Sequence, residues 1–310
     1  MKKNDIKYTV ICASKNEERD IKYLLDSFIT LNKNYKNCEL IVIDDSSDKT
    51  PSILKKYAKN NNNIFYIEGK NEGCCQARNL GISQSRGKYI VFMTADSFFE
   101  GDFLDKIDHY YCQGYDAVMV NSKVANLDSI WSIFLDCWHK EKLDNKPNFS
   151  PLTTQGYSVK KASALKVGLI DHGVFKPNIC RDWTLIKKMD AKKMKKIFVR
   201  DIFCNHFAPK TKDEFIYTHF TRGVISAGYA KKFANRSLFS CFFRTGVKFL
   251  LVLYDFFVPY KVIKKSFRMI KFTEKKSRFF IFYCLYFVKS ICFVLGELNT
   301  FVRYMCGKYT

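Results

Sequence analysis

Three aspartates lie where apolar stretches of the chain predict the ends of β-strands. Asp44 ends the predicted strand 38–44, Asp45 follows it directly, and Asp96 lies near the end of the predicted strand 88–97. Neighbouring carboxylates repel one another, so their placement at the end of an apolar strand indicates a binding or catalytic use. The structural alternative is a simple turn at Asp-Asp-Ser-Ser-Asp, since Asp and Ser favour turns.

Strands alternate with helices over the first 111 residues. Apolar residues at helical spacing follow the short apolar runs, and Thr50 before Pro51 is typical of a helix N-cap with proline at the first helical position. The alternation predicts an α/β fold with a mostly parallel sheet and helices on both faces. Ligands bind such sheets beyond the carboxyl ends of the strands, so the three aspartates are expected along one edge. The predicted strands are 7–14, 38–44, 63–69 and 88–97, and the predicted helices are 16–31, a segment from 50, 71–87 and 101–111.

The chain from residue 115 to residue 209 is less regular. The run 116–125 predicts a strand, and 153–171 predicts a strand or loop followed by a helix and a turn. A helix is predicted to open within 181–189, and a strand within 196–209 is predicted to end near His206.

The positive charge of the chain is confined to its second half. The chain has 310 residues and a formal charge of +22. Residues 1–150 carry 21 basic and 21 acidic side chains, whereas residues 151–310 carry 31 basic and 9 acidic ones. A basic, aromatic second half suits an anionic surface, which membrane lipid and nucleic acid both provide. The 12 cysteines show no C-x-x-C spacing and there is no recognisable leader, so reduced thiols of a cytosolic protein are expected.

Two long aromatic-rich segments, 237–260 and 279–301, flank the basic stretch 261–278. Each approaches the roughly 20 residues that span a bilayer, but charged residues such as Lys248 and Lys289 interrupt them. Amphipathic helices in the membrane interface, or a shallow hairpin, are therefore expected, with the basic stretch on anionic headgroups. Spanning helices and packing on the protein's own core are the alternatives. The clustering of the aromatics in apolar runs favours lipid over nucleic acid.

Four motifs resemble those of family 2 glycosyltransferases with the GT-A fold. They are "YTVICASKNEE", "LIVIDDSSDKT", "NEGCCQARNLGISQSRGKYIVFMTADS" and "RDWTL", and they occur in the order and approximate spacing of that family. The resemblance covers about residues 7–230. It implies a GT-A catalytic domain over 1–235, followed by a membrane-associating helical region over 236–310.

The resemblance also implies a nucleotide-sugar donor and a divalent cation, Mg²⁺ or Mn²⁺, that neutralises its diphosphate. Asp45 corresponds to the residue that contacts the nucleotide base, and Asp44 would support that loop or face the ribose. Glu17 matches a position near the nucleotide. Arg78 matches a basic residue near the diphosphate, with a surface ion pair as its alternative.

The metal site departs from the family pattern. The family has D-x-D where this chain has Thr94, Ala95 and Asp96, so only the second carboxylate, Asp96, remains as a metal ligand. A hydroxyl is a poorer cation ligand, and weaker metal affinity is expected unless His206 helps to complete the site. A structural histidine is the alternative for His206. Ser46 also stands where glycine is common.

The resemblance assigns the catalytic base to Asp182, which aligns with the second residue of the family's E-D motif. Arg181 replaces the glutamate and should keep Asp182 ionised, although Asp182 could also serve only at the helix start. Trp183 is expected either to stack on a sugar or to lie in the core. Arg222 is expected either to contact a diphosphate or lipid phosphate or to be an ordinary surface arginine.

The combined prediction is an inverting glycosyltransferase at the cytoplasmic face of the cell membrane. It would move a sugar from a nucleoside diphosphate sugar to a lipid-linked or polysaccharide acceptor. The alternative is a catalytically impaired protein of the same fold that acts as a membrane scaffold, which Thr94 and Arg181 favour. Nucleic-acid binding by the basic half is the least favoured function.

Overall fold

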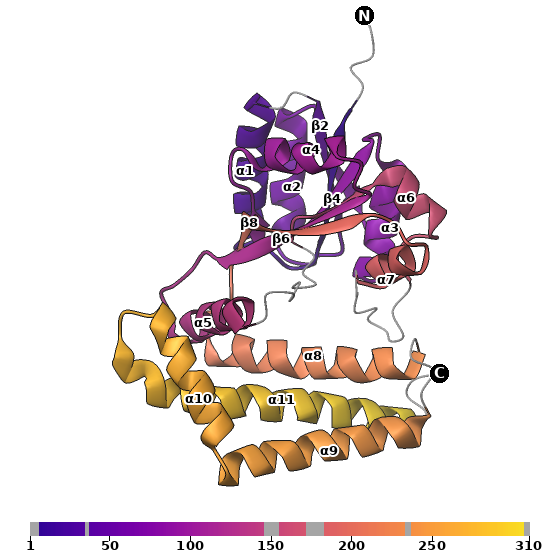
Figure 1. The fold of residues 1–310 in the computed structure, drawn as a ribbon. Helices are drawn as coiled ribbons and strands as arrows, with labels where there is room; N and C mark the ends of the chain where they lie inside the picture. The colour runs from indigo at the N-terminus through magenta and orange to yellow at the C-terminus, as the bar shows by residue number, and fades with distance from the viewer. Residues whose placement is uncertain (1–5, 35–36, 146–154, 172–182, 233–236, 307–310) are drawn as a thin grey trace, which may run out of the picture. The chain divides into compact units, whose positions relative to one another are not determined.

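The computed structural model describes residues 6–34, 37–145, 155–171, 183–232 and 237–306. The chain forms two compact units (Figure 1). An α/β unit comprises Met1–Lys123 and Ser150–Phe207, and a helical unit comprises Val124–Phe149 and Ala208–Thr310. This division by packing differs from the functional boundary predicted at residue 235, which stays a prediction.

A mixed sheet forms the centre of the α/β unit, with the strand order β3-β2-β1-β4-β7-β6-β8-β5. Strands β1 to β4 pair in parallel, whereas β7 pairs antiparallel with β4 and β6, and β5 pairs antiparallel with β8. The predicted α/β fold is therefore confirmed, and an antiparallel half extends its parallel half. The strands are β1 Tyr8–Ser14, β2 Cys38–Asp44, β3 Ile64–Glu68, β4 Tyr89–Thr94, β5 Ser97–Phe98, β6 Ala117–Val124, β7 Tyr157–Lys160 and β8 Lys196–His206.

Helices cover both faces of this sheet, as predicted for strands that are apolar along their whole length. Val10 and Val42 point into one hydrophobic cluster, which includes Phe28. Ile11 and Phe92 point into the other. The alternation of neighbouring side chains between the two clusters follows from the period of two along a strand. The helices are α1 Ile21–Asn34, α2 Thr50–Asn60, α3 Cys74–Gln84, α4 Phe103–Cys112, α6 Lys161–Lys166 and α7 Trp183–Ala191.

The predicted start of α2 is wrong by one residue. Lys49 is the N-cap, and Thr50 is the first residue of the helix. Asp48 Oδ1 accepts the N–H of Thr50 at 2.9 Å. Aspartate is a favoured acceptor for the free N–H groups at the start of a helix. The Thr50 hydroxyl instead accepts the backbone N–H of Glu17 at 2.9 Å. Thr50 therefore ties the loop after β1 to α2.

The helical unit contains five α-helices among its described residues, with two short 3₁₀ turns. Its core includes Phe134, Phe215, Phe282 and Leu285, which come from α5, α8 and α11. Asn126 accepts the N–H of Ala208 at 2.7 Å and donates to its carbonyl at 2.9 Å, so the two places where the chain enters this unit are joined. The helices are α5 Ile130–Asn145, α8 Lys212–Lys232, α9 Leu238–Phe257, α10 Tyr260–Met269 and α11 Phe279–Met305.

Helix α9 turns many large apolar side chains outward and polar ones inward. Lys248 forms an ion pair with Glu297 of α11, Thr245 donates to the same carboxylate at 3.2 Å, and Asp255 is buried. The segment Lys276–Met305, which includes α11, is the one helical stretch among the described residues that is long and apolar enough to cross a bilayer. Contiguous exposed apolar surface usually marks an interaction site. The exposed apolar residues of α9 include Phe239, Phe242, Phe243, Phe249, Leu250, Leu251, Tyr254, Phe256 and Phe257.

Two glycines let α8 and α11 approach each other closely. A Cβ atom on Gly223 would collide with the carbonyl group of Phe293, and one on Gly296 would collide with that of Phe220. These obstacles are backbone atoms, which cannot move aside as a flexible side chain can. The contact between α8 and α11 therefore requires glycine at both positions.

We expect Gly296→Ala to lower the free energy of unfolding by about 1–3 kcal/mol, because overpacking forces the two helices apart. Gly246→Ala is the matched control, since a Cβ on Gly246 of α9 meets nothing within 4 Å. That change should stabilise the protein by about 0.5–1 kcal/mol through helix propensity. Thermal unfolding of both variants checks the prediction, and equal effects would contradict it.

Candidate active site

Residues from four segments converge on the buried end of β1. The thiol of Cys12 is fully buried, and burial raises its pKa above the usual range. The charged groups that act on this pKa are Arg78, which lowers it, and Glu17, Asp96 and Asp44, which raise it. In the sheet register, Ser14 of β1 lies opposite Asp44 of β2 and Ala13 lies opposite Thr94 of β4, so Asp44, Asp96 and the Glu17 loop lie at the carboxyl ends of neighbouring strands.

Asp44 supports the loop that follows β2. Burial raises the pKa of its carboxyl group, and the hydrogen bond from the hydroxyl of Ser46 opposes that shift. Ser46 donates to Asp44 Oδ1 at 2.5 Å and accepts the backbone N–H of Asn16 at 2.7 Å. Ser46, which replaces the usual glycine, thus joins the loops after β1 and β2.

Asp45 borders a cleft between the ends of β2 and β3 and the start of α3. Its Oδ1 accepts the backbone N–H of Asn71 at 2.8 Å. A Cβ on Gly69 would collide with this oxygen, so glycine there makes room for the Asp45 side chain. The cleft has a volume of about 220 Å³, which is enough for one part of a ligand rather than for a whole drug-sized molecule. Its lining includes Asp45, Gly69, Lys70, Gly73, Gln76 and Ala77.

A tight turn between β4 and β5 presents Asp96. Ser97 donates to the carbonyl oxygen of Thr94 at 2.6 Å, and the Thr94 hydroxyl lies 3.1 Å from Ser97 Oγ. Thr94 thus serves the turn at the position where the family has a carboxylate. Asp96 Oδ1 is buried and has no hydrogen-bond partner among the described residues. A buried carboxylate oxygen of this kind is suited to receive a cation.

His206 lies beside this turn because β5 and β8 pair, with Ser97 opposite His206. The Phe207 N–H also donates to the Asp96 carbonyl at 2.9 Å. His206 Nδ1 lies 3.3 Å from the Lys123 carbonyl oxygen and 2.9 Å from Ser122 Oγ. A neutral imidazole that donates from Nδ1 to a carbonyl carries a lone pair on Nε2, which is the form that binds metals.

Asp96 and His206 together fit a divalent cation only in part. No group of three or more His, Cys, Asp or Glu side chains suited to a metal ion occurs among the described residues. A hard cation commonly completes its coordination with substrate phosphates and water. The described side chains therefore suit a cation that binds together with a diphosphate.

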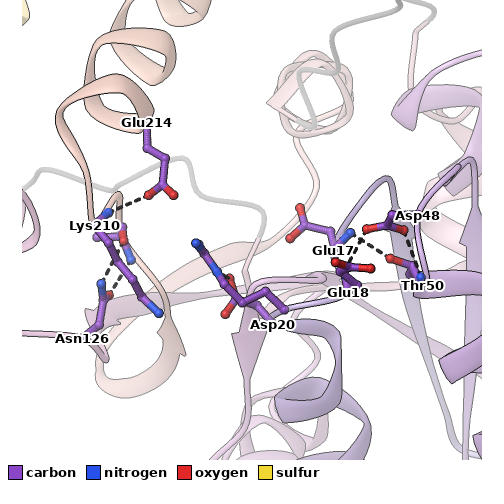
Figure 2. A network of polar contacts seen from close by, with 10 residues as sticks. Glu17, Glu18, Asp20, Asp48, Thr50, Asn126, Lys210 and Glu214 are labelled. Atoms are coloured by element: carbon purple, nitrogen blue, oxygen red, sulfur yellow. Dashed lines mark hydrogen bonds and ion pairs between the residues drawn. The ribbon is translucent and has the colours of Figure 1, made fainter.

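Glu17 follows β1 in a loop that backbone hydrogen bonds hold against α2 (Figure 2). Beside it, Glu18 N–H donates to Asp48 at 3.3 Å, and Glu18 Oε2 accepts the N–H of Lys49 at 3.0 Å. Burial raises the pKa of the Glu17 carboxyl to about 8, with the charges of Asp96 and Asp20 adding to the shift. The loop thus holds an acid that is largely protonated at neutral pH in the absence of ligand.

Other predicted residues are placed less fully. Asp182 and Arg181 lie outside the described residues, so the predicted base stays a prediction. Trp183 begins α7, and only its backbone is described. Arg222 is exposed on α8 of the helical unit. The sequence analysis did not identify Asn16 and Ser122, which contact Ser46 and His206. Asn16 has a φ angle of +56°, which asparagine tolerates better than most residues, so an asparagine directly before Glu17 could have indicated this turn.

The α/β unit is a mixed sheet with acidic residues at its strand ends, which is a GT-A-like arrangement. The model of the family described as glycosyl transferase family 2 matches residues 9–166. The chain therefore belongs to glycosyl transferase family 2.

Curated relatives match about a third of the chain. Glycosyltransferase GlyA of Streptococcus pneumoniae is 36% identical over 104 residues, which are 33% of this chain and 15% of that protein. Minor teichoic acid biosynthesis protein GgaB of Bacillus subtilis is 35% identical over 106 residues, which are 33% of this chain and 12% of GgaB. The chain thus matches only a small part of the length of these relatives.

Solved structures share the fold at low sequence identity. Mannosyltransferase PcManGT from Pyrobaculum calidifontis, in complex with GDP-Man and Mn²⁺, has a TM-score of 0.62 at 13% identity, covering 95% of this chain and 86% of that one. TarS from S. aureus has a TM-score of 0.51 at 14% identity, covering 94% of this chain and 55% of TarS. At these identities the likeness concerns the fold alone.

The raised pKa of Glu17 makes stability depend on pH. An acid whose folded-state pKa lies above its unfolded value of about 4.5 destabilises the folded protein progressively as pH rises toward 8. Glu17→Gln should remove this loss, so the ligand-free variant should gain on the order of 2 kcal/mol over wild type at pH 8 and nothing below pH 4.5. Thermal unfolding across pH 4–9 checks this. Replacement of the exposed Glu68 by Gln is the control, and parallel profiles for Glu17→Gln and wild type would contradict the prediction.

Proposed function

We propose that this glycosyltransferase moves a sugar from a nucleoside diphosphate sugar to an acceptor hydroxyl, with inversion at the anomeric carbon. The observation that carries the proposal is that Glu17, Asp44 and Asp96 lie at the carboxyl ends of the neighbouring strands β1, β2 and β4. Parallel sheets bind ligands at this edge. A buried arginine beside carboxylates suits a ligand that brings phosphates together with a cation.

The base and the diphosphate of the donor, and the cation bound to it, are each assigned to different residues at the carboxyl edge of the sheet. Asp45, beside the cleft near α3, accepts hydrogen bonds from the base, and Asp44 holds the loop in place. Arg78, which is buried on α3, binds the diphosphate. Asp96 and His206 hold the divalent cation. When bound, Mg²⁺ or Mn²⁺ supplies positive charge that stabilises the departing diphosphate.

Asp182 is the general base of the proposed reaction. It takes the proton of the acceptor hydroxyl as the new bond to the anomeric carbon forms and the bond to the diphosphate breaks on the opposite side. A single in-line displacement of this kind inverts the configuration. Trp183 follows Asp182 directly and offers an aromatic face for the sugar.

The acceptor is proposed to be lipid-linked or a growing polysaccharide at the cytoplasmic membrane face. Two observations support this. GgaA and GgaB, which match part of this chain, are named as minor teichoic acid biosynthesis proteins. Helix α9 exposes its apolar side chains while pairing Lys248 inside, as expected of an amphipathic helix that lies in the membrane interface.

Donor binding provides a direct test. Asp45→Asn should weaken the binding of UDP or GDP about tenfold or more, because a charge-assisted hydrogen bond is lost. Asp96→Asn should instead remove the part of the binding that depends on Mn²⁺. The shift of the melting temperature with nucleotide, with and without Mn²⁺, measures both effects. Asp105→Asn, at an exposed position of α4, is the control, and full Mn²⁺ dependence in Asp96→Asn would contradict the metal assignment.

Turnover separates the transferase from the scaffold alternative. Asp182→Asn should lower kcat about 100-fold or more without changing nucleotide binding, because general-base catalysis is lost. Asp201→Asn, at an exposed position of β8, should leave kcat unchanged. Sugar transfer and donor hydrolysis, measured with a panel that includes UDP-GlcNAc and GDP-Man, provide the readout. Full activity in Asp182→Asn would show that another group acts as the base, and wild-type inactivity with every donor would favour the scaffold.

A further inference from the structure

The helical unit gathers lysines from three helices around one indole ring. Lys142 of α5, Lys289 of α11 and Lys265 of α10 lie 3.6, 4.6 and 5.5 Å from the centroid of the Trp138 ring. Cation–π attraction accounts for one such contact. Cation–π attraction does not explain why three ammonium groups gather around one ring, because their like charges repel one another.

The electrostatics of Lys289 show how costly this arrangement is. The pKa of Lys289 is lowered to about 7, mainly by burial and in addition by the positive charges of Lys142, Lys265 and Arg222. The dominant charges that act on this ammonium group are therefore all positive. A bound anion would reverse the cost by favouring the charged form.

Of the two carboxylates near this cluster, Glu141 pairs with Lys265 of the cluster as well as with Arg268, and Asp255 pairs with a lysine outside it. Glu141 lies 3.5 Å from Lys265 and 3.3 Å from Arg268. Asp255 lies 3.8 Å from Lys261 and acts on Tyr286. The region thus keeps an excess of positive charge in the part of the chain that the structure describes.

Two buried polar atoms of the helical unit have no hydrogen-bond partner among the described residues. His219 is only 2% exposed, and its Nε2 has no hydrogen-bond partner among the described residues. Burial lowers the pKa of His219 to about 2, with Arg222, Lys289 and His139 contributing, so its ring is neutral. Trp138 Nε1, which can only donate, is likewise buried without a described partner. A buried polar group left in this state destabilises a protein unless a ligand or water satisfies it.

We propose that Trp138, Lys142, Lys265 and Lys289 form a binding site for a phosphate group. A phosphate offers several acceptor oxygens and negative charge, which are what the indole N–H of Trp138 and the excess of cations require. The site belongs entirely to the helical unit and does not involve the residues assigned to the donor.

The phosphate is that of a lipid. Helix α11, which carries Lys289, also exposes Phe280, Ile281, Ile291 and Leu295. An anionic head bound by the lysines and an apolar chain along such a surface together describe an anionic lipid. The source is either a headgroup of the bilayer or the phosphate of a lipid-linked acceptor, and the second source rests on the function proposed above.

The test uses the full chain with Lys142→Gln and Lys289→Gln combined. Co-sedimentation is measured with phosphatidylcholine vesicles that contain phosphatidic acid, a long-chain isoprenyl phosphate or no anionic lipid. The variant should bind both phosphate-bearing vesicles about tenfold or more weakly than wild type, because charge-assisted contacts are lost. The matched control combines Lys56→Gln and Lys59→Gln of α2, which removes the same charge from exposed positions outside the basic stretch 261–278 and should weaken binding far less.

The outcomes separate the two lipid sources and the structural alternative. Preference of wild type for isoprenyl phosphate identifies the acceptor, and equal binding identifies a headgroup. Equal losses in the variant and the control would overturn the site in favour of general surface charge. Without ligand, the variant should melt no lower than wild type, because buried repulsion is relieved. A lower melting temperature with unchanged lipid binding would mean that the lysines only pack on Trp138, and would also overturn the site. No donor is present, so these results do not depend on transferase activity.

Discussion

The proximity of like charges at the ends of β1, β2 and β4 is the constraint on which the site depends. Glu17, Asp44 and Asp96 all raise the pKa of the buried Cys12 thiol, and Asp96 also raises that of Glu17. Such an arrangement costs free energy in the empty protein, because burial and mutual repulsion both disfavour the ionised forms. The same arrangement is favourable once positive charge enters, and Arg78 already supplies part of it.

Hydrogen bonds that involve backbone and side-chain groups of separate loops hold the acidic residues at the strand ends in place. Ser46 joins Asn16 to Asp44, Thr50 receives the N–H of Glu17, and the Asp96 carbonyl accepts the N–H of Phe207. Apart from the local bond between Ser46 and Asp44, each of these bonds connects segments that are distant in sequence. Repulsive side chains remain close because their backbones are fixed independently, and this is how proteins preorganise sites for charged ligands.

The helical unit is organised by a different balance. Its α9 helix buries polar groups such as Thr245 and Asp255 and exposes phenylalanines, which reverses the usual pattern of a surface helix. Gly223 and Gly296 allow close contact of α8 and α11, so the unit does not rely on α9 alone for its packing. The outer face of α9 is thus apolar, and contiguous exposed apolar surface usually marks an interaction site.

The sequence alone determined the parallel strands, the order of the motifs and the family, because strand periodicity, turn residues and motif spacing are local properties. It also placed Asp44, Asp45 and Asp96 at strand ends. Only the tertiary structure decided that Thr50 serves the Glu17 loop rather than capping α2, that Thr94 serves the turn before Asp96, and that β8 places His206 beside that turn. The lysines around Trp138 come from three helices that are far apart in the sequence. Such contacts depend on long-range packing, and no local pattern in the chain encodes them.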